Sequence, residues 1–358
     1  MIATVPSATL LGVRGRAVSV EVHVSNGLPG FTIVGLPDAS CREARDRVRA
    51  ALLSSGLRWP LRRVTVNLAP SGLRKAGSQL DLAIAVALLV ADEVLEPSHV
   101  ADTGFLGELG LDGAIRGVAG TVPLVAALPG ATAVVAASSV PEANLVGRHQ
   151  VRAAATLSDL VPALRGEAPW PEPPPLPTPP PPPPDPDLAD VRGQPFARLA
   201  LELAAAGGHH LLMVGSPGAG KTMLARRLPG LLPDLTADQA LEATMIHSAS
   251  GIPLRGGMVQ RPPFRAPHHG ASTVSLTGGG SAAMRPGEIS LAHHGVLFLD
   301  ELGEFQASVI DALRQPLEEG VIRVSRAAGT VSFPARVLLV AAMNPCPCGL
   351  AGAPPRCM

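Results

Sequence analysis

Tyrosine is absent from the 358 residues, and aromatic side chains of all kinds make up only 3% of them. Proteins that bind single-stranded nucleic acid by stacking need several aromatic rings, so the composition gives this mode of binding little support. An excess of one charge is also missing, because 29 basic side chains are matched by 29 acidic ones. The net charge therefore neither indicates nor excludes a polyanionic partner.

Long hydrophobic runs and a disulfide framework are missing too. The longest apolar run, residues 82–90, suits a buried helix and is shorter than the roughly 18 residues that a membrane span needs. Residues 1–11 lack a basic start and contain Pro6 and Ser7, which is unlike a signal peptide. Three of the four cysteines lie between residues 346 and 357, a spacing that predicts no set of disulfides. We therefore expect a cytoplasmic protein that makes no membrane contact.

Proline is abundant and concentrated in one place. Between residues 171 and 186, 12 of the 16 residues are proline. Such a stretch favours an extended polyproline spacer, on the order of 50 Å long at ~3.1 Å per residue. It predicts a first domain over residues 1–168, a linker over 169–186 and a second domain over 187–358.

A candidate phosphate-binding loop lies near the start of the second domain. Residues 215–222 follow the apolar run 211–214, precede a helical pattern, and match G-x-x-x-x-G-K-[ST] in its required strand–loop–helix setting. The glycines let backbone N–H groups converge on phosphate oxygens. We expect Lys221 to neutralise the β- and γ-phosphates of ATP and the Thr222 hydroxyl to hold Mg²⁺. The predicted nucleotide-binding residues of the loop are Gly215, Ser216, Pro217, Gly218, Ala219, Gly220, Lys221, Thr222 and Met223.

Two carboxylates follow a second apolar run. Residues 295–299 predict a buried strand that ends at Asp300 and Glu301. In a parallel sheet such a strand delivers its last residues to the edge where the phosphate loop lies. We therefore predict that Asp300 holds the Mg²⁺ shell and that Glu301 is the catalytic group that polarises the attacking water. The alternative is an ordinary helix cap, since acidic residues favour helix N-termini.

A third apolar run, residues 337–343, ends at Asn344. A polar amide at the same sheet edge could orient the attacking water or sense the γ-phosphate. A turn-forming asparagine before Pro345 is the alternative interpretation.

The first domain mixes strand and helix patterns. Residues 18–24 and 64–68 alternate in the way of half-buried strands, whereas residues 39–54 and 80–90 predict helices. The arginines of the first helix are interspersed with acids, which favours a solvated face over a nucleic-acid patch. This pattern predicts an α+β domain.

The first domain resembles the Lon-protease-like domain of magnesium-chelatase-related ATPases over residues 67–71, 74–83 and 107–113. Gln79 stands near the position of the Lon nucleophile, and Lys75 is the only lysine in this half. A Ser–Lys dyad needs an amine to activate the hydroxyl, and the matching region around residues 117–124 contains no lysine. We therefore expect the domain to be a scaffold or a partner-binding module. Ser78 with Lys75 is the one candidate pair for a peptidase, the disfavoured alternative.

The second domain resembles the magnesium-chelatase clade of AAA+ ATPases, and within it the YifB/ComM group. Beside the motifs above, the matching stretches are residues 261–269, 285–293, 313–320 and 321–333. The resemblance implies an α/β P-loop domain with a parallel sheet and an inserted hairpin. It also implies a homo-hexameric ring with ATP at subunit interfaces and, for ComM members, DNA branch migration in recombination or natural transformation. The motor subunit of a magnesium chelatase is the alternative within this clade.

Two further expectations rest on this resemblance. Gln194 lies in a segment similar to the one beside the adenine in the family, with a linker turn as the alternative. In the family a further strand, an arginine finger and a helical lid follow the position of Asn344, whereas this chain has 14 residues after it. We therefore expect a truncated form that binds ATP weakly and turns it over slowly.

Basic side chains without nearby acids mark residues 254–285, where a glycine-rich loop could contact the DNA backbone or a neighbouring subunit. The candidate DNA contacts, two of them on the hairpin, are Arg261, Arg265, Arg285, Arg323 and Arg326. His268 and His269 make a weak metal pair, because adjacent residues of a strand face opposite ways. Cys346, Cys348 and Cys357 could supply three of the four ligands of a structural Zn²⁺, or they could be free thiols.

Overall fold

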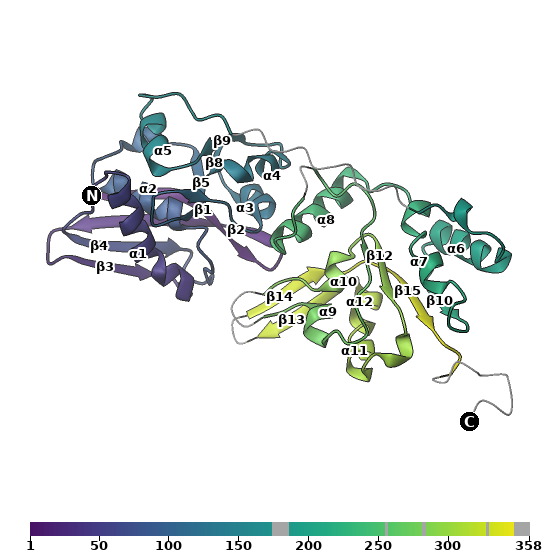
Figure 1. Cartoon of the computed structure of the whole chain (residues 1–358). Helices are drawn as coiled ribbons and strands as arrows, with labels where there is room; N and C mark the ends of the chain where they lie inside the picture. The colour runs from purple at the N-terminus through teal and green to yellow at the C-terminus, as the bar shows by residue number, and fades with distance from the viewer. Residues whose placement is uncertain (174–185, 255–256, 281–283, 327–328, 347–358) are drawn as a thin grey trace. The chain divides into compact units, whose positions relative to one another are not determined.

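The structure is a computed structural model that describes residues 1–173, 186–254, 257–280, 284–326 and 329–346 (Figure 1). The chain forms two compact units, residues 1–179 with 247–257 and residues 180–246 with 258–358. The domain limits expected from the proline-rich stretch stay a prediction, because residues 174–185 lie outside the described part. None of the helices in the described ranges is long and apolar enough to span a bilayer.

The first unit is built on a four-stranded sheet of order β1-β2-β4-β3 (Figure 1). Its strands are β1 (Ile2–Leu11), β2 (Arg14–Ser25), β3 (Gly30–Val34) and β4 (Arg63–Ala69). The pairs β1–β2 and β2–β4 are antiparallel, and β3–β4 is parallel. The alternating valines of β2, Val18, Val20 and Val22, are buried as their period predicts.

Two helices cover this sheet, α1 (Ala39–Ser54) and α2 (Asp81–Ala91), at the places predicted. All 11 residues of α2 are buried, because the helix packs against β1, β2 and α1. A second sheet holds three parallel strands, β5 (Thr103–Leu106), β8 (Thr132–Ala136) and β9 (Gln150–Ala154), in the order β5-β8-β9. The remaining elements are β6 (Glu108–Leu109), β7 (Ile115–Arg116), α3 (Thr121–Ala127), α4 (Val140–Asn144) and α5 (Leu157–Leu164).

The predicted solvated face of α1 has one exception. Arg47 turns inward and binds the buried carboxylate of Asp81 through Nε (2.6 Å) and Nη2 (3.0 Å). Burial raises the pKa of Asp81 to about 6, against the lowering effect of the Arg47 hydrogen bond and charge. The sequence pattern missed this pair because the two residues belong to different helices.

The candidate peptidase pair is divided between different partners. The Lys75 ammonium group is buried and donates to the carbonyl oxygen of Pro70. The Ser78 hydroxyl donates to the carboxylate of Glu108. Since each side chain is held by another group, these contacts lend the peptidase alternative no support.

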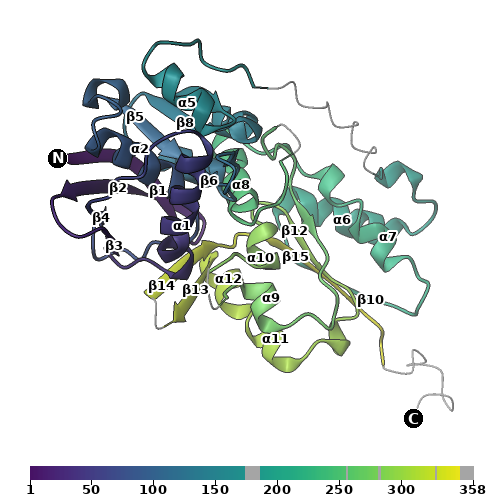
Figure 2. The same cartoon turned by 60° about the vertical axis from the view of Figure 1, so that its left-hand side comes forward.

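The second unit contains the predicted parallel sheet (Figure 2). Its strands β10 (Leu211–Val214), β15 (Leu338–Met343), β12 (Val296–Leu299) and β11 (Phe264–Arg265) run parallel in the order β10-β15-β12-β11. Every residue of β12 is buried, as expected for a strand inside a parallel sheet. The three predicted apolar strands therefore end at one sheet edge, and the predicted α/β class is confirmed.

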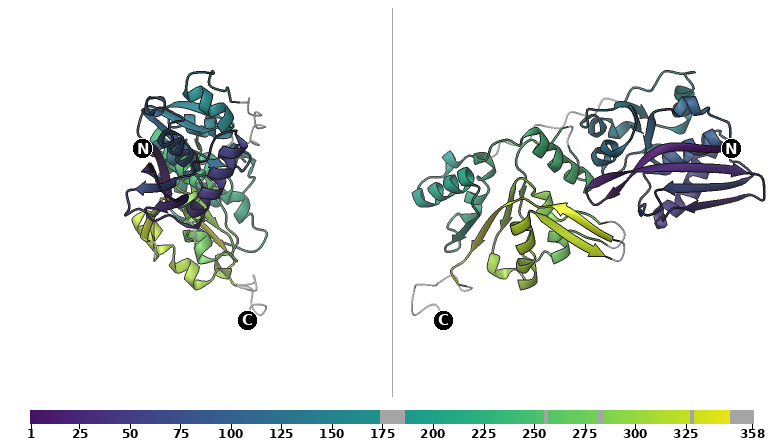
Figure 3. Two further views of the ribbon diagram at one scale, coloured as in Figure 1. Left: turned by 90° about the vertical axis from the view of Figure 1, so that its left-hand side faces the viewer. Right: turned by 180° about the vertical axis from the view of Figure 1, so that it is seen from behind.

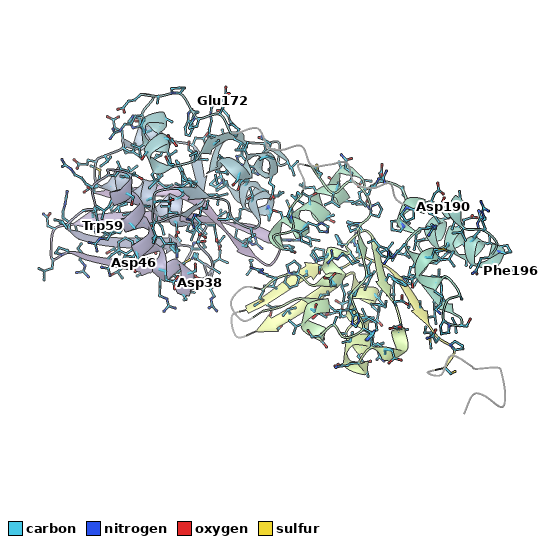
Figure 4. The ribbon with its side chains drawn as sticks, viewed as in Figure 1. Asp38, Asp46, Trp59, Glu172, Asp190 and Phe196 are labelled. Atoms are coloured by element: carbon cyan, nitrogen blue, oxygen red, sulfur yellow. The ribbon has the colours of Figure 1, made fainter. Side chains whose placement is uncertain are left out.

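Helix α6 (Pro195–Gly207) packs one face against this sheet through Leu201, with Ala197 and Ala205 beside it. Its other face leaves Phe196, at 87% exposure, uncovered within the unit (Figure 4). The predicted hairpin is present as the antiparallel pair β13 (Val321–Arg326) and β14 (Gly329–Pro334), drawn in yellow (Figure 3). The other helices are α7 (Lys221–Ala225), α8 (Ala237–Ala249), α9 (Thr273–Thr277), α10 (Glu288–Leu291), α11 (Ala307–Asp311) and α12 (Arg314–Glu319).

Candidate nucleotide-binding site

The phosphate loop joins β10 to α7. Gly218 and Gly220 adopt the left-handed φ values of 78° and 85°, where side chains other than glycine are strained. A Cβ at Gly218 would meet no described atom within 4 Å, so the loop is open on that side. The loop therefore has the curled backbone that presents amide groups to phosphate oxygens.

Lys221 links the loop to the end of β15. Its ammonium group donates to the carbonyl oxygens of Gly215 (2.7 Å) and Ser216 (3.0 Å) and to Oδ1 of Asn344 (3.1 Å). These neutral oxygens satisfy the three donors of the lysine. A bound phosphate could replace them with stronger, charge-assisted hydrogen bonds.

Thr222 and Asp300 meet between α7 and the end of β12. The Thr222 hydroxyl donates to Oδ2 of Asp300 at 2.6 Å, and Oδ1 of Asp300 accepts from the backbone N–H of Glu301 at 3.0 Å. Hydroxyl and carboxylate oxygens are the hard ligands that Mg²⁺ prefers, so this donor set fits the predicted ion. Both residues, with Lys221, Glu301 and Asn344, line a single cavity of about 400 Å³.

Glu301 is held by a residue that sequence reasoning assigned no role at this site. Its Oε2 lies 3.0 Å from Nδ1 of His269, and its backbone has a left-handed φ of 52°. The His269 ring meets Phe305 edge to face at 6.5 Å. His269 follows β11, which pairs with β12, and this adjacency of strand ends is the signal that could have predicted the contact.

The expectation that His268 and His269 face opposite ways is wrong. Strand β11 ends at Arg265, so the two histidines do not follow the alternation of a strand. Their rings lie only 4.0 Å apart, and His269 is engaged with Glu301.

Gln194 contacts the phosphate loop from outside the cavity. Its side-chain amide donates to the carbonyl oxygen of Ala219 at 2.7 Å, and its backbone is left-handed with φ 55°. This contact ties the segment before α6 to the loop. The proposed place of Gln194 beside the adenine stays a prediction.

Two of the arginines predicted to contact DNA have acidic partners. Arg265 binds Glu288 through two hydrogen bonds of 2.6 and 2.8 Å, and Arg323 pairs with Glu319. The absence of acids between residues 254 and 285 therefore does not mean that these arginines lack acidic partners, because Glu288, the partner of Arg265, follows soon after this stretch. Arg261 and Arg285 are exposed, and the side chain of Arg326 lies outside the described part.

A separate polar group joins Glu242 of α8 to His293 and His294, which precede β12. Oε2 of Glu242 accepts from Nε2 of His293 (3.2 Å) and of His294 (2.8 Å). Among the described residues, these three side chains lie close enough together to be considered as ligands of one metal ion. However, Nδ1 of His293 accepts the backbone N–H of Arg336 (3.0 Å), so the proton of the neutral ring is on Nε2. A protonated nitrogen cannot bind a metal. The three side chains are better explained as hydrogen bonds that join α8 to the segment before β12.

The zinc hypothesis gains no support. Of the three cysteines only Cys346 belongs to the described residues, whereas Cys348 and Cys357 lie outside them.

Comparisons with known proteins identify the family. Residues 187–358 match the family model described as magnesium chelatase, subunit ChlI, and residues 20–144 match that described as subunit ChlI of Mg-chelatase. The competence protein ComM of Haemophilus influenzae is 47% identical over 354 residues, covering 97% of this chain and 69% of that protein. The uncharacterized protein YifB of Escherichia coli is 46% identical over 341 residues, covering 95% and 67%.

A solved structure of the complex between subunits BchI and BchD of magnesium chelatase shares 28% identity with this chain. It covers 43% of this chain and 53% of its own, with a TM-score of 0.36, which is too low to support the assignment. The sequence relatives extend over nearly all of this chain at more than 45% identity. The chain therefore belongs to the YifB/ComM family of magnesium-chelatase-like AAA+ ATPases.

Proposed function

We propose that this chain binds Mg²⁺-ATP in the cavity between α7 and the ends of β12 and β15, hydrolyses it, and uses the energy to remodel DNA. The main support is the hydrogen bond between Thr222 and Asp300, which lie in the same cavity as Lys221 and Glu301. Two elements distant in the sequence thus bring a phosphate loop and a carboxylate pair to one place.

Each side chain of the cavity has a role in this proposal. The loop amides and Lys221 bind the β- and γ-phosphates, and Thr222 and Asp300 hold Mg²⁺, which neutralises phosphate charge when bound. Glu301 accepts a proton from the water that attacks the γ-phosphorus, and Asn344 orients that water. The bond to the bridging oxygen breaks, so that ADP leaves with its electron pair and inorganic phosphate is formed.

A Glu301→Gln variant tests the hydrolytic role. The amide keeps the shape of the side chain but cannot take a proton, so phosphate production should fall by about 10²-fold or more. Binding of a fluorescent ATP analogue should stay unchanged. Glu304→Gln removes an exposed acid from the same turn and is the matched control. Equal phosphate production by the two variants would remove Glu301 from the mechanism.

The DNA part of the proposal rests on likeness to the competence protein ComM and on the exposed side chains of Arg261 and Arg285. Strand displacement on a synthetic four-way junction should require ATP and be lost in Glu301→Gln. Because backbone contacts release counterions, binding should weaken steeply with salt. Arg285→Gln should weaken junction binding and leave nucleotide binding unchanged.

The motor of a magnesium chelatase is the second candidate, supported by the two matching family models. ATP hydrolysis without any effect on the junction, together with recovery of porphyrin-binding subunits in a pull-down, would favour it. In either case the names of two relatives, which are subunits of magnesium chelatases, support an oligomer. We propose a homo-hexameric ring, to be tested by light scattering with a slowly hydrolysed ATP analogue.

A further inference from the structure

Two more cavities of the second unit adjoin the nucleotide cavity. The first, of about 350 Å³, shares Thr222, Asp300 and Glu301 with it. A larger one of about 660 Å³ begins where the first ends, at Arg226, Ala266 and Pro267. Shared lining residues thus link the three cavities into a path from the phosphate loop past the ends of β12 and β11.

This path begins at Glu301, beside which the proposed reaction cleaves the terminal phosphate. In the proposed reaction, ADP still occupies the phosphate loop when inorganic phosphate has formed. Phosphate that leaves first therefore needs an opening other than the one by which ATP entered. Because the first two cavities share Asp300 and Glu301 in their lining, the 350 Å³ cavity adjoins the place where the new anion forms.

Arg226 is the cation that the anion would meet next. It ends α7 one turn after Thr222, and its backbone N–H donates to the Thr222 carbonyl at 3.2 Å, so both side chains reach the 350 Å³ cavity. Within the described residues the Arg226 guanidinium has neither an ion pair nor a hydrogen bond. By contrast, its neighbour Arg227 pairs with Asp190, and Arg265 further along the path pairs with Glu288.

We propose that the 350 Å³ cavity is an exit site for inorganic phosphate and that Arg226 is the residue that binds the departing anion. This proposal rests on the proposed ATP hydrolysis. His268 and His269 also line this cavity, and His269 contacts Glu301, which the cavity shares with the nucleotide cavity. The larger basic cavity then leads the phosphate to solvent.

Binding of inorganic phosphate to the full chain tests the proposal directly. In the presence of saturating Mg²⁺-ADP, phosphate should bind the wild type and bind Arg226→Gln about tenfold to a hundredfold more weakly, because a charge-assisted hydrogen bond is lost. Arg226→Lys should restore part of the affinity. Arg314→Gln, which removes an exposed arginine that lines none of the three cavities, is the matched control. Affinity for ADP should be equal in all four proteins.

The outcomes separate the two proposals. Failure of the wild type to bind ADP would overturn the nucleotide site and the exit site together. Normal ADP binding with equal phosphate affinity in wild type and Arg226→Gln would overturn the exit site alone. Competition between a DNA duplex and phosphate that depends on Arg226 would assign the arginine to the nucleic-acid backbone, and would also overturn it.

Discussion

Replacing His293 by asparagine should remove part of the pH dependence of stability in the second unit. His293 is 3% exposed and lies between Glu242 of α8 and the backbone of Arg336, just before β15. Asparagine can still accept the Arg336 N–H but cannot titrate. The substitution therefore isolates the contribution of the imidazole proton equilibrium.

The magnitude follows from the pKa of His293. Burial, helped by the charge of His294, lowers this pKa from 6.5 to about 4, against the raising effect of Glu242. The imidazole of His293 therefore becomes protonated near pH 6.5 in the unfolded chain, but stays neutral in the folded unit until about pH 4. The contribution of His293 to the stability of the second unit is fully present above pH 6.5 and is lost as the pH falls towards 4. Linkage at 1.36 kcal/mol per pKa unit gives a loss of about 2 kcal/mol between pH 7.5 and pH 5.

Urea unfolding followed by far-ultraviolet circular dichroism between pH 5 and 7.5 measures this loss. Trp59 and Trp170 both belong to the first unit, so their fluorescence reports that unit separately. The variant should lose less stability on acidification than the wild type by about 2 kcal/mol. His209→Asn, at an exposed position of the same unit, should behave as the wild type.

Two results would refute the reasoning. An identical pH dependence in His293→Asn and the wild type would show that the imidazole does not titrate as inferred. Stabilisation of the wild type by Zn²⁺, lost in the variant, would show that Nε2 of His293 is a metal ligand and that the proton assignment is wrong.

Two more predictions concern the two units separately. Arg47→Ala leaves the carboxylate of Asp81 buried without its partner, and should cost about 3 kcal/mol in urea unfolding read by tryptophan fluorescence, whereas the exposed Arg45→Ala should cost little. His269→Ala removes the contact that positions the Glu301 carboxylate, and should lower phosphate production about tenfold with unchanged ADP affinity. An unchanged rate would show that His269 does not orient Glu301.

Much of the candidate site could be read from local sequence. The glycine spacing of residues 215–222 requires left-handed turns that only a few residue types adopt, and the helix after it is short-range structure. The apolar runs before Asp300 and Asn344 predict buried parallel strands, and such strands end at one sheet edge. These inferences succeeded because each depends on residues next to one another in the chain.

The tertiary structure alone decided which charged side chains far apart in the sequence pair. Arg47 with Asp81, Glu242 with His293 and His269 with Glu301 are each separated by more than 30 residues. No local pattern distinguishes these side chains from solvated ones, because their partners are chosen by the packing of helices and strand ends. The sequence by itself therefore determined the family, the strands and the phosphate loop. The packing determined how Glu301 is held and left Arg226 without a partner among the described residues, since only folding brings distant charges within reach.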